Sequence, residues 1–346
     1  MRQRRNGPFG FLLMLTVAGA LFYGIAEAQD LTAIASEQGA HGMLPRERAE
    51  AKAAVRVSPT SGGAGALVYH GGPVMTSATA YAIFWAPAKL QNGQATSLPA
   101  SYQNIQTALL QGYPGHGIDS NNTQYYMITG SLYFRFTSFV QGAGGFGGSY
   151  VDTSAYPASA CSDYYTPGNC LSDAQIQDEV KKVMALKGWT GGLNHIFFVY
   201  TSEGEGSCAS FGCAYTDYCA YHGYFTSGST TVLYGNEPYA AAPYCQGGTS
   251  PNGDPAGDSA ASITSHELTE AITDPELNAW YSADGEEIGD LCAWTYGTNT
   301  WAGGQANQYW PVSYSNLFIL GHFPITSFEL QQQYDNHTAS CVQVGP

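Results

Sequence analysis

Basic residues are nearly absent from the second half of this 346-residue chain. No Lys or Arg occurs after Lys187, whereas sixteen Asp and Glu residues lie between that position and Pro346. The formal net charge is −15, and an acidic chain repels the phosphate backbone of nucleic acids. We therefore expect no nucleic-acid partner. We also expect the unmatched carboxylates to be solvated, protonated or bound to cations.

Long apolar runs are lacking too, except near the N-terminus. Three arginines among the first five residues precede an apolar run over residues 9–25, which ends at Ala26-Glu27-Ala28. This order is typical of a secretory signal peptide, and the run is short and rich in glycine for a membrane anchor. We predict a signal peptide over 1–28, a linker or pro-segment over 29–66 and a globular domain over 67–346. The mature protein is then secreted and has no membrane span.

All eight cysteines lie beyond the signal peptide, and an even number in an exported chain predicts up to four disulfides. They are Cys161, Cys170, Cys208, Cys213, Cys219, Cys245, Cys292 and Cys341. Cys161 and Cys170 bracket a short loop, so we expect them to pair. The alternative, a zinc cluster of Cys208, Cys213 and Cys219, is disfavoured because the spacing is not CxxC and export favours oxidation.

The pattern of apolar residues predicts strands and helices that alternate in the first half of the chain. Strands are expected over 80–85, 196–200 and 231–234, a long strand or hairpin over 125–140, and a strand-like piece over 317–320. Helices are expected over 99–111, 172–186 and 258–273, the second capped by Ser172 or Asp173 and the third by Asp258 or Ser259. We expect an α+β fold, a single disulfide-stabilised domain with a mixed β-sheet flanked by helices. A zincin-like arrangement is compatible with that order.

One stretch carries the chemistry, His266-Glu267-Leu268-Thr269-Glu270. On a helix, His266 and Glu270 lie one turn apart on the same face, which is the spacing by which HExxH helices hold zinc. Here Glu270 replaces the second histidine, and a carboxylate also ligates zinc. We predict His266 and Glu270 as metal ligands, Asp290 or Glu287 as the third ligand, and Glu267 as the catalytic base that activates water.

Carboxylates crowd this part of the chain, with ten of them between Asp254 and Asp290. Several follow the end of the expected helix, where the helix dipole disfavours negative charge. A bound cation resolves the repulsion: histidine with carboxylates suits zinc, whereas carboxylates alone suit calcium. The alternative is a solvated acidic helix with a buried structural histidine. We interpret His222, which lies beside a cysteine, and His195 as structural rather than as ligands.

Several further segments form a recognisable set. They are Tyr69-His70-Gly71-Gly72-Pro73, residues 81–85, the segment from Cys208 to His222-Gly223, Tyr234-Gly235-Asn236 with Cys245, Thr273-Asp274-Pro275 through Cys292, and Cys341. Together they resemble the phosphate-induced, EXORDIUM-like family of secreted proteins. The His-Glu-x-x-Glu, Thr-Asp-Pro and Glu-Ile-Gly-Asp elements resemble microbial relatives rather than plant members, which generally lack the His-Glu pair. The resemblance implies a secreted protein and fixes no substrate.

Two functions fit these observations. The first is a secreted metal-dependent hydrolase, in its most specific form a zinc-dependent, zincin-like metallopeptidase that acts on an extracellular peptide or cell-wall substrate. The second is a non-catalytic extracellular module that binds cell-wall glycan and holds a structural cation. Zinc would accompany the first and calcium the second.

Overall fold

The computed structural model of the chain describes six stretches of residues: 40–56, 66–131, 134–142, 144–241, 243–310 and 327–346. They lie in one compact unit, Ile34–Pro346, and the other unit, Met1–Ala33, lies outside the described residues. The signal peptide and the strand-like piece over 317–320 also fall outside them, and the domain boundaries stay predictions.

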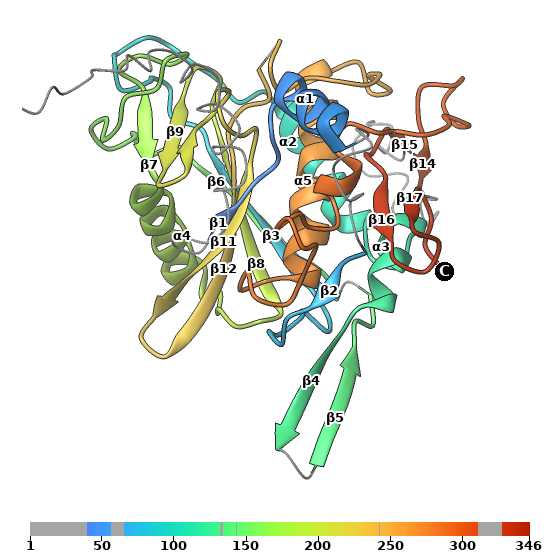
Figure 1. The fold of residues 1–346 in the computed structure, drawn as a ribbon. Coiled ribbons are helices and arrows are strands. Elements are labelled where there is room, and N and C mark those ends of the chain that lie inside the picture. Colours follow the sequence, from blue (N-terminus) through green and yellow to red (C-terminus); the bar gives the residue numbers. More distant parts are fainter. Residues whose placement is uncertain (1–39, 57–65, 132–133, 143, 242, 311–326) are drawn as a thin grey trace, which may run out of the picture. The chain divides into compact units, whose positions relative to one another are not determined.

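A six-stranded mixed β-sheet forms the centre of the described unit (Figure 1). Its strands, in spatial order, are β1 (Ala40–His41), β11 (Tyr221–Ser227), β12 (Thr230–Glu237), β8 (His195–Thr201), β3 (Thr79–Trp85) and β6 (Gly145–Asp152). The last four run parallel, whereas β11 is antiparallel to β12 and β1 is antiparallel to β11. The central strands β3 and β8 are buried along almost their whole length, as expected for parallel strands covered on both faces.

Helices cover both faces of this sheet. The hydroxyl of Tyr221 on β11 donates to Asp173 at the start of α4 (Asp173–Lys187), whereas the next residue, His222, lies 4.0 Å through Nε2 from Oε2 of Glu270 on α5 (Pro255–Thr273). Successive side chains of a strand point to opposite faces, so α4 and α5 lie on opposite sides of the sheet. Figure 1 shows this arrangement, with α2 (Ala100–Gly112) packed beside α5.

The remaining elements are short. They are α1 (Arg46–Arg56), α3 (Gly117–Ser120), the 3₁₀ turns η1 (Asn121–Gln124) and η2 (Asp290–Cys292), and the strands β2 (Val68–Tyr69), β4 (Tyr126–Ser131), β5 (Phe134–Phe139), β7 (Cys170–Ser172), β9 (Gly206–Ala209), β10 (Gly212–Cys213), β13 (Trp280–Tyr281), β14 (Gln308–Tyr309), β15 (Ser327–Phe328), β16 (Gln333–Asp335) and β17 (Ser340–Val342). Strands β4 and β5 pair as an antiparallel hairpin, one of the two forms predicted for residues 125–140.

The helices predicted over 172–186 and 258–273 are α4 and α5, and the prediction of the N-cap is correct only for α4. Helix α4 begins where predicted: Ser172 is its N-cap and forms a capping box with Gln175. Helix α5 begins at Pro255, three residues before the predicted start, and its cap is Asp254, which accepts a hydrogen bond from the amide of Gly257. The predicted cap at Asp258 or Ser259 was therefore wrong, because proline favours the first position of a helix and Asp254 precedes it.

Four disulfides join all eight cysteines: Cys161–Cys170, Cys208–Cys213, Cys219–Cys245 and Cys292–Cys341. The predicted pairing of Cys161 with Cys170 is confirmed, and so is the α+β class with a mixed sheet flanked by helices. Among the described residues, no helix has the length and apolar character needed to cross a membrane.

Candidate metal centre

Helix α5 brings the predicted motif into the interior. Every residue of the helix from Ala256 to Thr273 is buried, and His266, Glu267 and Glu270 have no solvent-exposed surface. As predicted from the spacing of one turn, His266 and Glu270 meet: Nε2 of His266 lies 3.0 Å from Oε1 of Glu270. This helix is therefore a central element of the fold and not a solvated acidic surface helix.

A first group of possible ligands combines His266, Glu270 and Asp290. Each residue offers one atom, and these atoms lie within 4.8 Å of one another. Nε2 of His266 is 3.8 Å from Oδ1 of Asp290, and the amides of Gly289 and Asp290 both donate to Oε1 of Glu270. Gly289 permits this close approach of the loop, because a Cβ atom there would lie 2.6 Å from Nδ1 of His266.

A second group combines His222, Glu267 and Glu270, again with one atom from each within 4.8 Å of the others. His222 comes from β11, where it pairs across the ladder with Gly235 and faces α5. Its Nε2 lies 3.1 Å from Oε2 of Glu287 and 4.0 Å from Oε2 of Glu270. Glu270 therefore belongs to both groups, whereas Glu287, expected as a partner of His266, contacts His222 instead.

The sequence does not indicate that His222 lies beside Glu267 and Glu270. His222 lies forty-four positions before His266, and only the register of β11 brings its ring over α5. No spacing rule links a strand residue to a helix so distant in sequence. His195 is the first residue of β8, and its Nδ1 lies 2.6 Å from the carbonyl oxygen of Thr190. This contact fits the structural interpretation of His195.

Gln331 distinguishes the two histidines. Its Oε1 accepts a hydrogen bond from the amide of Trp294, and its Nε2 donates to the carbonyl of Gly289, so the orientation of the side-chain amide is fixed. The same Nε2 lies 2.8 Å from Nδ1 of His266, which must then accept and, when neutral, carry its proton on Nε2. A metal-bound histidine usually donates from its second nitrogen. The geometry thus favours His266 as a group that orients Glu270.

Four carboxylates of this centre, Glu267, Glu270, Glu287 and Asp290, are buried. At the edge of this centre, Lys52 of helix α1 forms an ion pair with Glu286. Backbone amides supply further compensation: Met43 donates to Oε1 of Glu267 over 3.0 Å. Burying several carboxylates costs several kcal/mol each unless they are paired, protonated or bound to a metal.

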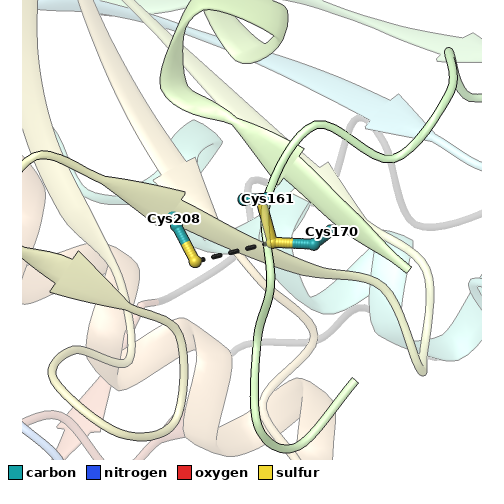
Figure 2. Close-up of side chains that lie close together, drawn as sticks. All are labelled: Cys161, Cys170 and Cys208. Carbon is teal, nitrogen blue, oxygen red and sulfur yellow. Dashed lines mark hydrogen bonds between the residues drawn. A yellow bond between two sulfur atoms is a disulfide. The ribbon is translucent and has the colours of Figure 1, made fainter. Parts of the chain in front are cut away.

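Three sulfur atoms form another group with metal-ligand spacing, those of Cys161, Cys170 and Cys208 (Figure 2). Figure 2 shows the bond between Cys161 and Cys170, with the sulfur of Cys208 lying 3.5 Å from that of Cys170. Cys208 is itself bonded to Cys213. A disulfide sulfur is not a thiolate, so these residues form no zinc site, in agreement with the prediction of disulfides.

Comparison with known proteins finds short stretches of similarity. The chain is 42% identical over 52 residues to protein EXORDIUM-like 5 of Arabidopsis thaliana, which covers 14% of each chain. It is 37% identical over 73 residues to protein EXORDIUM-like 3 of the same plant, covering 19% of this chain and 22% of the relative. The similarity thus spans less than a quarter of the relatives' length. No protein-family model and no solved structure matches the chain.

Proposed function

We propose that this is an extracellular protein of the EXORDIUM-like kind whose buried histidine–carboxylate centre holds one divalent cation. The partial similarity to two EXORDIUM-like proteins supports the first part. Four disulfides support an oxidising, extracellular setting. The microbial branch of the family, marked by the His-Glu-x-x-Glu motif, is part of the same proposal.

The observation that carries the metal centre is the convergence of His222, Glu267 and Glu270. Their ligand atoms lie within 4.8 Å of one another, they come from a strand and a helix, and all three side chains are buried. One imidazole with carboxylate oxygens is a donor set that suits zinc, and calcium would use the carboxylates alone. In this arrangement His266 orients Glu270, and Glu287, whose Oε2 lies 3.1 Å from Nε2 of His222, is close enough to be a further ligand.

A second candidate function, a metal-dependent hydrolase of the metallopeptidase type, is favoured by one contact. The backbone amide of Met43 reaches Oε1 of Glu267, so a polypeptide backbone already lies at the centre. A bound zinc ion would supply a Lewis acid for peptide-bond hydrolysis. With residues 40–44 in place, however, the centre is closed to a substrate, and the state described here suits a non-catalytic module with a structural cation.

Thermal unfolding with and without a chelator tests the proposed centre. A cation that binds only the folded state raises the free energy of unfolding by about 4 kcal/mol at a thousandfold excess over its dissociation constant. We expect the chelator to lower the melting temperature of the natural protein by roughly 10 °C. We expect it to have no effect on His222→Ala, which loses a ligand.

The matched control is His337→Ala, since His337 is exposed and lies outside the centre. This variant should respond to the chelator as the natural protein does. A melting temperature of the natural protein that does not depend on chelator or on added zinc and calcium would contradict the proposal.

A further inference from the structure

The N-terminal segment 40–56 crosses the proposed centre. Its first residues form β1, which adds a strand to the edge of the sheet by pairing Ala40 with Gly223 and His41 with His222. The chain then passes over α5, where Met43 is fully buried and its amide donates to Oε1 of Glu267. Helix α1 follows directly. The segment thus covers two of the three proposed ligands.

Backbone atoms make the hydrogen bonds of residues 40–44 with this surface, and the side chain of Met43 packs into the hydrophobic core. The amide of Cys219 donates to the carbonyl of Met43 over 2.7 Å, and the indole of Trp294 donates to the carbonyl of Leu44 over 3.0 Å. Together with the amide of Met43 and the β1 ladder, these hydrogen bonds would fit the backbone of an extended peptide. Adding a strand to an exposed sheet edge is a common way to bind a peptide.

One position of the segment is restricted by close packing. A Cβ atom on Gly42 would lie 2.4 Å from the carbonyl oxygen of Ala220 and 2.7 Å from Cβ of Tyr221. The first neighbour is a backbone atom, and the second is attached directly to the backbone, so neither can easily move. A peptide bound in the same way therefore needs glycine at this position, and the buried side chain of Met43 calls for an apolar residue at the next one.

Two ion pairs hold α1. Arg48 pairs with Asp217, and both side chains are partly exposed, so this pair contributes little, typically less than about 1 kcal/mol. Lys52 pairs with Glu286, whose side chain is only 3% exposed, so this pair is the stronger of the two. A cavity of about 70 Å³ between α1 and the loop that carries Asp290 shows that the helix is not closely packed there.

We propose that residues 40–44 occupy a peptide-binding surface made by Cys219, His222, Gly223, Glu267 and Trp294, and that an extended peptide binds there when segment 40–56 leaves. The segment then acts as an internal inhibitor that closes the centre. The ligand class is an extended peptide with glycine followed by an apolar residue, recognised through its backbone hydrogen bonds and that apolar side chain. The inference rests on the proposed function only in that the surface which the segment covers includes the proposed metal ligands.

The experiment releases the segment from the full chain. A site for a sequence-specific protease is inserted between Ser61 and Gly62, the protein is cut, and the N-terminal fragment is removed by gel filtration in mild urea. A fluorescent peptide with the sequence of residues 38–56 is then added, and its anisotropy is measured. We expect saturable binding, and we expect the same peptide with Gly42→Val to bind at least about tenfold more weakly.

Three outcomes overturn the inference. If the remaining protein unfolds when the fragment is removed, the segment is a permanent part of the core. If the remaining protein stays folded by near-ultraviolet circular dichroism but binds no peptide, or binds both peptides equally, the surface does not recognise a backbone as described. Metal content measured on the same sample separates the two proposals. Specific peptide binding without metal contradicts only the metal centre, and metal without peptide binding contradicts only this inference.

Discussion

Helices α4 and α5 lie on opposite faces of one sheet, and each brings carboxylates into the interior in a different way. On α4, Glu179 is almost fully buried beside Asp152 at the end of β6, and Lys182 forms ion pairs with both. On α5, Glu267 and Glu270 are buried with two imidazoles and without any lysine or arginine of the helix. The first cluster is neutralised by its own helix. In the second, the contacts described come from imidazoles and backbone amides.

On the α4 side of the sheet, the buried carboxyl groups and Lys182 balance one another's charge. Burial and a hydrogen bond to Asp152 raise the pKa of Glu179 to about 8. Burial alone would raise the pKa of Asp152, but hydrogen bonds from Glu179, Lys182 and Ser154 lower it. One shared proton and one ammonium group therefore balance two carboxyl groups at neutral pH. The comparison shows that a buried acidic cluster does not by itself indicate a metal, because a lysine and a shared proton can balance it.

The largest expected effect comes from Glu270→Gln, because Glu270 belongs to both possible ligand groups. With a cation bound, the variant loses an anionic ligand, and we expect the free energy of unfolding to fall by about 3 kcal/mol. Without a cation, the same change relieves repulsion among carboxylates and should stabilise the protein. Urea unfolding gives the sign directly. Glu276→Gln is the matched control, since Glu276 lies past the helix end and accepts a hydrogen bond from Thr231.

The next effect should appear on the other side of the sheet. Lys182→Met removes the cation shared by Asp152 and Glu179, and we expect a loss of about 1–2 kcal/mol, reduced by the partial exposure of Lys182. Lys181→Met is the control, because Lys181 pairs with the exposed Asp178 and lies over the ring of Phe225, and its loss should change stability by less than about 1 kcal/mol. Equal effects of the two changes on thermal unfolding would contradict the account of the α4 cluster.

A third prediction concerns pH and Glu205, a buried carboxyl group whose two oxygens have no hydrogen-bond partner among the described residues. Burial raises its pKa to about 8 from an ordinary value of 4.5. Between these values the unfolded chain releases the proton and the folded protein keeps it, so the free energy of unfolding falls as pH rises from about 4.5 to about 8.

Glu205→Gln should remove that part of the pH dependence, so that the difference in unfolding free energy between pH 5 and pH 8 shrinks by at least about 1 kcal/mol. Glu203→Gln, two residues away and exposed, should leave the difference unchanged. If both variants keep the pH dependence of the natural protein, Glu205 is not the group responsible.

The smallest expected effect concerns the N-cap of helix α4. Ser172→Ala removes the cap of α4 and should cost about 1 kcal/mol in thermal or urea unfolding, because local interactions hold that end. Ser227→Ala, at an exposed strand end, should be nearly neutral. A loss of several kcal/mol from Ser172→Ala would mean that the hydroxyl does more than cap the helix.

Helices α4 and α5 also show which features of the fold and of the candidate site can be predicted from the sequence. Helix α4 follows local rules of capping and amphipathic spacing, and its cap at Ser172 is confirmed. On α5, the spacing of His266 and Glu270 predicted their meeting, but the position of the cap at Asp254 was missed. The role of His222 depends on strand register and on how the sheet packs against the helix, which no short-range pattern encodes. The roles assigned to Glu267 and Asp290 stay predictions.

Elemental analysis of the purified natural protein tests the central claim most directly. The account predicts about one equivalent of a divalent cation per chain, zinc if an imidazole is among the ligands, and its loss in His222→Ala but not in His337→Ala. A natural protein that carries no divalent cation after purification without chelator, and takes none up from zinc or calcium solutions, would contradict it.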